Sequence, residues 1–492
     1  MASEPRKMPD LKTRINTALR DERLRGAVRY TADNLRTKRN AILADLNEQA
    51  AQGMAIGTFD DLRKQARRIK EHTLKHLDYY LEQAADQIRQ SGGTVHWAAD
   101  SADVVRITEE IIERRQAKKV IKSKSMASEE VALNHALEAK GIEVVESDLG
   151  EYIIQLAHET PAHIVIPAIH KTRQQIADMF GEVAGRQLTT DTPTLTRFAR
   201  ETLRQKFMAA DIGISGANFL VAETGTICLV TNEGNGRLIT SVPPCQITLV
   251  GMEKLVPRLE DLAVMMALLP RSATGQKITT YFNMITGPRR PGEPDGPEEL
   301  HVIFLDNGRS QILGSQYEEV LTCIRCGACL NSCPVYRQLG GHAYGSTYPG
   351  PIGSVLTPLL QGLEEWEELP QLCSLCGACH ENCPLGIHLH EYIIQLRGEL
   401  VARGRENPLM RTALKLVHFA WTRPGVYRFV AGSAHLGTKP FTRKRKDGSE
   451  YLDNLPSIAA GWTMSRTMPA PARRPFHQRW AELEQGGARD DQ

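Results

Sequence analysis

Two stretches of this sequence, Cys323-Ile-Arg-Cys326-Gly-Ala-Cys329-Leu-Asn-Ser-Cys333-Pro334 and Cys373-Ser-Leu-Cys376-Gly-Ala-Cys379-His-Glu-Asn-Cys383-Pro384, repeat one motif fifty positions apart. They hold eight of the ten cysteines in the chain. Three cysteines at two-residue gaps can wrap one side of a cubane cluster, and the glycine between them lets the backbone approach it. The spacing therefore predicts two [4Fe-4S] clusters.

The fourth cysteine of each run, followed by proline, ligates the other cluster in two-cluster proteins. We therefore expect two crossed ligand sets: Cys323, Cys326, Cys329 and Cys383 for one cluster, and Cys373, Cys376, Cys379 and Cys333 for the other. Structural zinc sites are the alternative, but zinc motifs rarely use four cysteines within eleven residues or duplicate that pattern. The helix-like segment from Ile352 to Leu363 between the runs favours an α-helical ferredoxin domain over a β-hairpin type.

The bulk composition describes a globular protein of several folding units. The 492 residues are 41% hydrophobic and 24% charged, with a net charge of +2 that gives no global attraction to nucleic acid or anionic lipid. The start of the chain lacks a secretory signal, and no apolar run is long enough to span a bilayer, so we expect a cytoplasmic protein. The remaining cysteines, Cys228 and Cys245, are expected to be buried, inert thiols.

Periodicity divides the chain into four regions: a helical arm at 1–90, an α/β domain at 91–306, the cysteine region at 307–400 and a helical or extended region at 401–492. In the α/β domain, predicted strands alternate with helices, which is typical of a doubly wound, mostly parallel sheet. The first of these strands are expected at Thr94 to Ala98, Lys119 to Lys122, Ile142 to Val145 and His163 to Ile169, and the helices at Ala102 to Gln116, Glu129 to Ala139 and Lys171 to Phe180.

Polar residues follow several predicted strands, where open α/β sheets bind ligands. The candidates for a pocket there are Lys124, Asp148, Glu151, His170, Glu223 and Thr224. Each has an ordinary alternative: Asp148 reads as a helix cap, and Thr224 with Gly225 as a hairpin turn. No GxGxxG or Walker A motif is present, which indicates that another polypeptide carries the two-electron chemistry.

Beyond the cysteine region, short amphipathic helices are expected at Ala413 to Phe419 and Val426 to Val430. Aromatic and arginine residues lie together there, which would suit a partner subunit or, alternatively, peripheral contact with a membrane. The basic stretch from Lys439 to Lys446 is expected to be a solvated loop rather than a nucleic-acid site. Phe476 and Trp480 form a candidate docking anchor.

The sequence resembles the lactate utilisation protein B family of iron-sulfur proteins over nearly its whole length. The resemblance rests on both cysteine runs and on five further segments: Val120 to Met126, Glu146 to Glu151, Pro161 to Lys171, Asn218 to Gly225 and Tyr348 to Gly353. It implies a lactate-utilisation domain, with a fold similar to the sugar-phosphate isomerase and CoA-transferase group, followed by a helical ferredoxin module.

The resemblance also implies a role in oxidising L-lactate to pyruvate, together with a cysteine-rich-domain subunit and a smaller subunit that shares the lactate-utilisation domain. It assigns no catalytic residue. We therefore expect an electron-transfer subunit, and two alternatives stay open. The chain could serve a glycerol-3-phosphate or heterodisulfide oxidoreductase complex, whose helical ferredoxin modules are similar. It could instead be an α/β-domain enzyme that handles acyl or phosphate groups, with structural or redox-sensing clusters.

Overall fold

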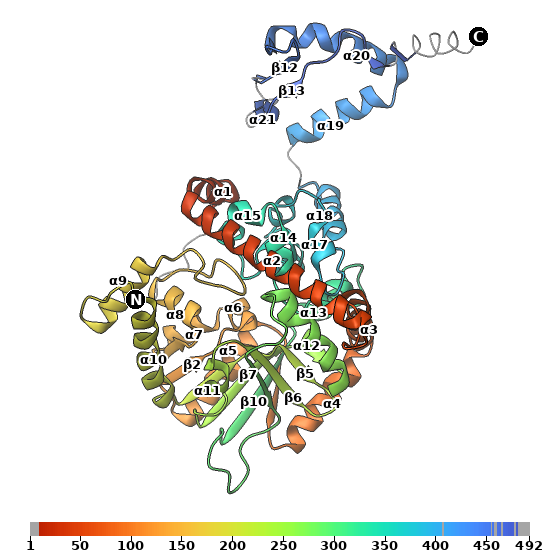
Figure 1. Ribbon diagram of the computed structural model, residues 1–492. Coiled ribbons are helices and arrows are strands. Elements are labelled where there is room, and N and C mark those ends of the chain that lie inside the picture. Colours follow the sequence, from red (N-terminus) through yellow and green to blue (C-terminus); the bar gives the residue numbers. More distant parts are fainter. Residues whose placement is uncertain are drawn as a thin grey trace. The chain divides into compact units, whose positions relative to one another are not determined.

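The computed structural model describes residues 9–405, 408–453, 455–456, 460–463, 466–476 and 479–480. The chain forms two compact units, Met1–Leu400 and Val401–Gln492 (Figure 1). The first unit contains the N-terminal helices, the α/β region and both cysteine runs. In the part of the chain just defined, no helix is long and apolar enough to cross a membrane.

A six-stranded sheet is the centre of the first unit. Its strands are β1 (Thr94–Ala98), β10 (Glu299–Leu305), β7 (Cys245–Gly251), β4 (Ile212–Ser215), β2 (Lys119–Lys122) and β3 (Glu143–Glu146), in that order. Every neighbouring pair is parallel. Strand β7 is buried along its whole length, as expected for a parallel sheet covered on both faces. The predicted mostly parallel α/β sheet is confirmed.

Helices cover both faces of this sheet. On one face, α5 (Ser101–Arg115) and α7 (Leu133–Ala139) pack on apolar strand residues such as Ile214 and Ile247. On the other face lie α4 (Leu77–Gln90), α8 (Leu149–Leu156), α9 (Arg173–Ala184) and α10 (Thr192–Met208). The opposed apolar surfaces make the sheet a rigid platform for the loops at its edge.

A second sheet has the order β8 (Leu255–Val256), β5 (Phe219–Val221), β6 (Thr226–Thr231) and β9 (Tyr281–Ile285). Strands β5 and β6 form an antiparallel hairpin whose turn contains Gly225 at φ 66°. A Cβ at Gly225 would lie 2.8 Å from the backbone nitrogen of Ile88, so glycine also permits the close approach of α4. Helix α12 (Leu259–Ala273) packs against this sheet.

Two predicted elements differ from the structure. The segment from His163 to Ile169 is a series of bends and turns, not a strand, because the His163 ring accepts the backbone N–H groups of Val165 and Ile166 and so closes a local turn. The helix predicted from Glu129 to Ala139 is two helices, α6 (Met126–Glu130) and α7, separated by Ala132 at φ 51°. That left-handed conformation cannot continue an α-helix.

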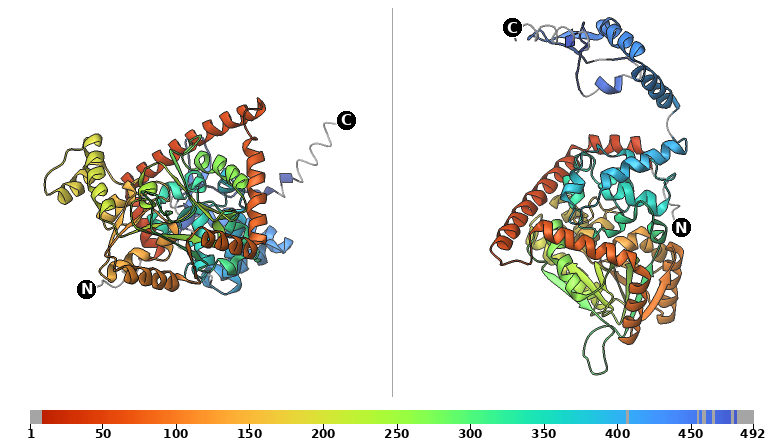
Figure 2. Two further views of the ribbon diagram at one scale, coloured as in Figure 1. Left: turned by 90° about the horizontal axis from the view of Figure 1, so that it is seen from below. Right: turned by 90° about the vertical axis from the view of Figure 1, so that its right-hand side faces the viewer.

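The N-terminal helices are α1 (Leu11–Arg20), α2 (Glu22–Ala51), α3 (Phe59–Lys75) and α4. Asp21 caps α2 by accepting the Leu24 N–H, and Thr58 with Asp61 forms a capping box on α3. Helix α2 packs on the cysteine region and on α12, and α3 packs on α12 and β8 (Figure 2). The arm therefore joins the α/β region to the cysteine region.

The cysteine region is built from helices α14 (Ala328–Ser332), α15 (Tyr336–Leu339), α16 (Gly350–Gln361), α17 (Ala378–Asn382) and α18 (Leu389–Ala402), with a 3-10 turn at Glu318–Thr322. Helices α14 and α17, one from each cysteine run, pack on each other, and α16 packs on α14. Each of these two helices begins within its own cysteine run, so their packing brings the two runs together.

The second unit contains α19 (Pro408–Trp421), α20 (Pro424–Thr438) and a small sheet of β11 (Thr442–Lys444), β12 (Glu450–Leu452) and β13 (Met468–Pro469). Among its described residues, only Leu452 and Thr463 are buried. The basic stretch predicted as a loop includes strand β11, because Arg443 and Lys444 pair with β12. Phe476 and Trp480 are exposed and lie ring to ring, with centroids 5.5 Å apart.

Candidate iron-sulfur centre and adjoining cavity

The two cysteine runs adopt the same backbone conformation. Arg325 and Leu375 both have φ 58°, and the glycines that follow the second cysteines, Gly327 and Gly377, have φ 76° and 77°. Left-handed residues turn the chain sharply, so that successive cysteines face one side of the loop. The repetition in the sequence is therefore also a repetition in shape.

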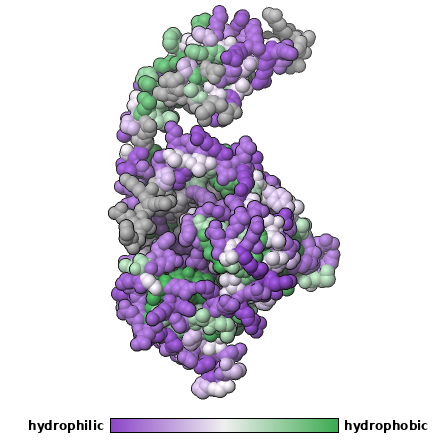
Figure 3. Space-filling model, turned by 90° about the vertical axis from the view of Figure 1, so that its left-hand side faces the viewer, coloured by the Kyte–Doolittle hydropathy of each residue, from purple (hydrophilic) through white to green (hydrophobic). Residues whose placement is uncertain are grey.

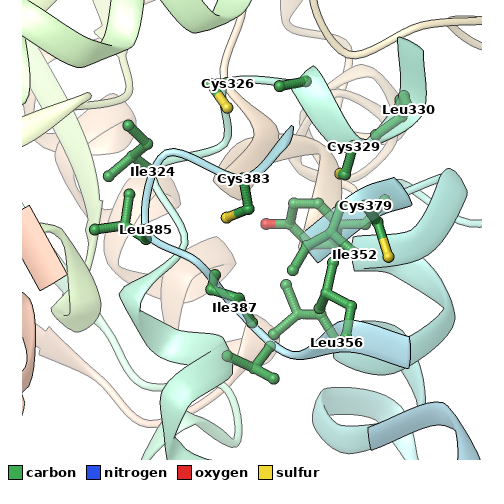
Figure 4. Close-up of a cluster of buried hydrophobic side chains, with 14 of the residues drawn as sticks. Ile324, Cys326, Cys329, Leu330, Ile352, Leu356, Cys379, Cys383, Leu385 and Ile387 are labelled. Carbon is green, nitrogen blue, oxygen red and sulfur yellow. The ribbon is translucent and has the colours of Figure 1, made fainter. Parts of the chain in front are cut away.

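Cys383 belongs to the second run but lies with the first. Burial, followed by the negative charge that Cys383 and Cys323 would carry, raises the pKa of Cys326 to about 12. Cys383 itself is buried, and Cys323 is among the groups that raise its pKa further. Figure 4 shows Cys326 and Cys383 with Cys329 among buried apolar side chains. Cys383 of the second run therefore lies close to cysteines of the first run.

Cys333 belongs to the first run but lies near cysteines of the second run. Burial raises its pKa to about 11, and the charges that Cys373 and Cys376 of the second run would carry also raise it. Burial also raises the pKa of Cys379 to about 12, and the next largest effects that raise it come from Cys373 and Cys333. A bound metal displaces the protons of the thiols that coordinate it, so these buried cysteines would hold a cluster as thiolates. The donor chemistry of both sets thus fits an iron-sulfur cluster.

The two sets differ in exposure. In the first run Cys326, Cys329 and Cys333 are buried, whereas Cys376 of the second run is exposed. Ile164 and Val165 cover the first run and lie 3.3 and 3.1 Å from a Cβ placed on Gly327. The one fully exposed cysteine of the two runs is therefore in the second run, although Cys323 and Cys373 are half-buried.

Arginines from the N-terminal arm hold the second run by its backbone carbonyls. Arg39 of α2 donates to the Asn382 carbonyl at 3.0 Å and to its side-chain oxygen at 3.1 Å. Arg63 of α3 donates to the His380 carbonyl at 2.6 Å, and Arg67 to that of Gly386 at 3.1 Å. These bonds join residues more than 300 positions apart, and no motif in the sequence predicted them.

A buried charge network lies beside the first run. Arg309 forms a bidentate ion pair with Glu130, with both N···O distances 2.9 Å, and a third bond to Glu253 at 2.5 Å. Arg325 lies 3.3 Å from the other oxygen of Glu253. Burial alone would raise the pKa of Glu253, but Arg309, Lys254 and Arg325 outweigh it and hold that pKa well below its usual range. The network fixes Arg325, and with it the turn between Cys323 and Cys326.

A cavity of about 1050 Å³ adjoins the same loop. Its walls come from the carboxyl ends of β2 and β3, from helix α6, from the loop around His163 and from the segment after α15. His163 and Ile164 line the cavity and also contact the first cysteine run, through Asn331 at 3.1 Å and Gly327. A single layer of side chains therefore separates the cavity from the cysteines.

Buried carboxylates dominate this cavity. Glu151 forms an ion pair with Lys124 at 3.1 Å, and Glu146 forms one with Lys122 at 2.7 Å. Glu129 forms an ion pair with neither Lys122 nor Lys124. Burial, and then the charge of Glu151, raises the pKa of Glu129 to about 8. The cavity can therefore hold a protonated carboxyl group at neutral pH, which is a proton donor or acceptor for a bound molecule.

Of the pocket residues expected from the sequence, the structure brings Lys124, Glu151 and His170 into this cavity. The other three do not line it. Asp148 caps α8 by accepting the Glu151 N–H at 3.1 Å. Glu223 accepts the Leu259 N–H at 3.3 Å, and Thr224 bonds Thr226 at 2.7 Å within the β5–β6 hairpin. Their ordinary roles as cap and turn residues explain them.

Several cavity residues were missed by the sequence analysis, above all Glu129, Glu146 and His342. Glu129 follows a capping serine in the sequence, so it has the pattern of an ordinary first-turn acidic residue. Only its burial beside Glu151 distinguishes it. Cys228 and Cys245 are both buried, as predicted, and burial raises their pKa values to about 12 and 11.

Comparison with known proteins assigns the family. A model described as "LUD domain" matches residues 81–305, and one described as "4Fe-4S dicluster domain" matches residues 319–387. Lactate utilization protein B of Oceanobacillus iheyensis is 46% identical over 437 residues, which are 89% of this chain and 90% of that protein. The chain belongs to the lactate utilization protein B family. The family member from Bacillus licheniformis is 44% identical over 473 residues, 96% of each chain.

A solved structure also aligns, that of a DUF162 family protein from Deinococcus radiodurans, with 15% identity over 46% of this chain and 98% of its own. Its TM-score of 0.27 is too low for the two folds to be compared. Family membership and the 4Fe-4S match together make this chain an iron-sulfur protein of lactate utilisation. The resemblance noted from the sequence is confirmed.

Proposed function

We propose that this chain is an electron carrier with two [4Fe-4S] clusters that serves the oxidation of L-lactate to pyruvate. The observation that carries the proposal is the packing of α14 on α17, which brings the two cysteine runs together with Cys383 near Cys326. When bound, each cluster supplies one-electron redox chemistry. The residues of this chain supply the rest: Arg39 and Arg325 place positive charge beside the cysteines, which favours the more negative, reduced form of a cluster.

The exposed second run suggests where partners dock. Cys376 and its neighbours Ser374 and Leu375 are exposed, whereas the first run is covered by the loop around Ile164. Electrons would cross to or from another subunit most readily at this uncovered edge. The partners that fit are the two named by the family resemblance, a cysteine-rich-domain subunit and a second subunit with a lactate-utilisation domain.

The cavity favours a second candidate function for the α/β region, which is to bind a small molecule. Its volume exceeds what lactate alone would fill, and its titratable groups include Glu129 beside the Lys124–Glu151 pair. Under this second candidate function the chain is itself an enzyme, and its clusters are structural or redox-sensing. A reversible cluster signal that responds to lactate would argue for the carrier instead.

The deciding experiment is anaerobic purification of the chain with both partner subunits, followed by iron and sulfide analysis and EPR spectroscopy before and after L-lactate. We expect about eight irons per chain and new cluster signals upon lactate addition. Signals that appear with dithionite but not with lactate would support an electron carrier that serves another dehydrogenase or a heterodisulfide-reductase-like complex instead. Clusters that cannot be reduced reversibly would contradict the carrier function.

A further inference from the structure

In the helical hairpin of the second unit, formed by α19 and α20, the large apolar side chains are exposed and small side chains occupy the half-buried positions. The half-buried positions of α19 carry small side chains at Ala413 and Ala420. The large apolar side chains face outward: Leu414 is 58% exposed, Trp421 73% and Phe429 75%. No residue of either helix is buried. Such an arrangement is expected where the surroundings of the helices, rather than their interior, are apolar.

Helix α19 carries one continuous apolar stripe. On α19, Met410, Leu414, Val417 and Trp421 recur at spacings of four, three and four, so they form one stripe, and all are exposed. Thr412 and Lys415 lie on the side of α19 away from this stripe, together with exposed Phe419. Helix α20 adds exposed Tyr427, Phe429, Val430 and Leu436. Figure 3 shows apolar residues at the surface of this unit.

Basic residues dominate the charge of this segment, and two of them, Arg443 and Lys444, form ion pairs with Asp453 and Glu450 just beyond it. From Asn407 to Lys446 the sequence contains no Asp or Glu and nine basic residues: Arg411, Lys415, Arg423, Arg428, Lys439, Arg443, Lys444, Arg445 and Lys446. A wide apolar stripe, interfacial tryptophan and tyrosine, and a basic polar face are the combination that anionic lipid surfaces bind. A nucleic acid would use the basic residues but leave the apolar stripe in water.

We propose that α19 and α20 lie in the headgroup layer of an anionic membrane, with the apolar stripe of α19 and the exposed apolar side chains of α20 towards the acyl chains and their basic residues towards the lipid phosphates. At 14 and 15 residues the helices are too short to span the bilayer, so they would lie along its surface. An anionic lipid surface fits better than a protein partner because protein interfaces are depleted of charge at their centre and use both signs at their rim. The second unit thus attaches the iron-sulfur protein to a membrane surface.

The test is co-sedimentation of the full-length protein with vesicles of phosphatidylcholine alone or mixed with phosphatidylglycerol. We expect at least tenfold more protein bound to the mixed vesicles, and a marked loss at 0.5 M NaCl. The double variant Leu414→Gln with Val417→Gln should lose binding, whereas Thr412→Gln, on the side of α19 away from the stripe, should keep it. The variant Lys415→Gln with Arg428→Gln should lose the preference for phosphatidylglycerol while the apolar stripe stays intact.

Equal and weak binding to both vesicle types would overturn the proposal. So would wild-type protein that ignores vesicles but loses its partner subunits when Leu414 and Val417 are replaced, because the stripe would then be a protein interface. Retention on DNA that the Leu414 and Val417 variant leaves unchanged, without vesicle binding, would also contradict it.

Discussion

The main-chain N–H of Arg325 donates to the sulfur of Cys323 at 3.4 Å, and fifty residues later the N–H of Leu375 donates to the sulfur of Cys373 at 3.3 Å. Both donors have φ 58°. An N–H···S bond stabilises negative charge on sulfur and so contributes to the potential of a cluster bound there. The two runs provide this donor alike, so a difference in potential between them would come from burial, from nearby charges and from further N–H···S bonds, such as the one from Tyr336 to Cys333 at 3.5 Å.

Paired cysteine substitutions test the crossed ligand sets. With crossed sets, Cys383→Ala with Cys323→Ala removes two ligands from one cluster and should leave about four irons per chain. Cys383→Ala with Cys373→Ala removes one ligand from each cluster and should leave clearly fewer. Iron analysis of anaerobically purified protein measures both. If each run held its own cluster, the two results would be exchanged.

Arg39 should tune the cluster nearest Cys326 and Cys383. Burial lowers its pKa, and those two cysteines oppose that effect, so its charge lies close to them. Arg39→Gln should make the reduction potential of that cluster more negative by tens of millivolts, on the order of 1–2 kcal/mol of Coulomb energy. Arg39→Lys keeps the charge and should shift the potential less, and exposed Arg36→Gln on the same helix should not shift it. An EPR-monitored redox titration that finds equal potentials in all three variants would contradict this role.

Glu129 should make stability fall as pH rises. Its pKa is about 8 in the folded chain, against an ordinary value of 4.5, so between these values the folded state keeps a proton that the unfolded state has lost. Linkage then lowers stability progressively from pH 4.5 to 8, by up to about 5 kcal/mol. Glu129→Gln removes this dependence, so its melting temperature relative to wild type should be higher at pH 8 than at pH 5.5. A constant difference at both pH values would show that Glu129 ionises normally.

Gly353 permits the close contact between helix α16 and the segment before it. A Cβ at this position would lie 1.5 Å from the Tyr348 carbonyl oxygen, so Gly353→Ala must displace the backbone. We expect a loss of about 1–3 kcal/mol in unfolding free energy and reduced iron content, because α16 packs on α14 of the first cysteine run. Gly26→Ala in helix α2 is the matched control, with nothing within 4 Å of the new Cβ, and should stabilise by about 0.5–1 kcal/mol. Thermal unfolding compares the two variants, and equal midpoints would contradict the contact.

Much of the local structure could be read from the sequence. The alternation of strands and helices predicted the parallel sheet, and the Thr224-Gly225 pair suggested the hairpin turn. One exception was the segment from His163 to Ile169, whose apolar residues have the composition of a strand. Its conformation depends on the His163 ring and on contact with Gly327, which lies 164 positions further along the chain.

The sequence by itself determined the cysteine loops, because three cysteines and a left-handed glycine within seven residues form a local unit whose shape depends on little else. Only the tertiary structure decided which charges surround those loops. The bonds from Arg39 to Asn382 and from Arg309 to Glu130 and Glu253 join distant segments, and the pKa of Glu129 depends on burial beside Glu151. Local spacing carries no information about such pairs, since a buried charge is matched by whatever the fold brings within a few ångströms of it.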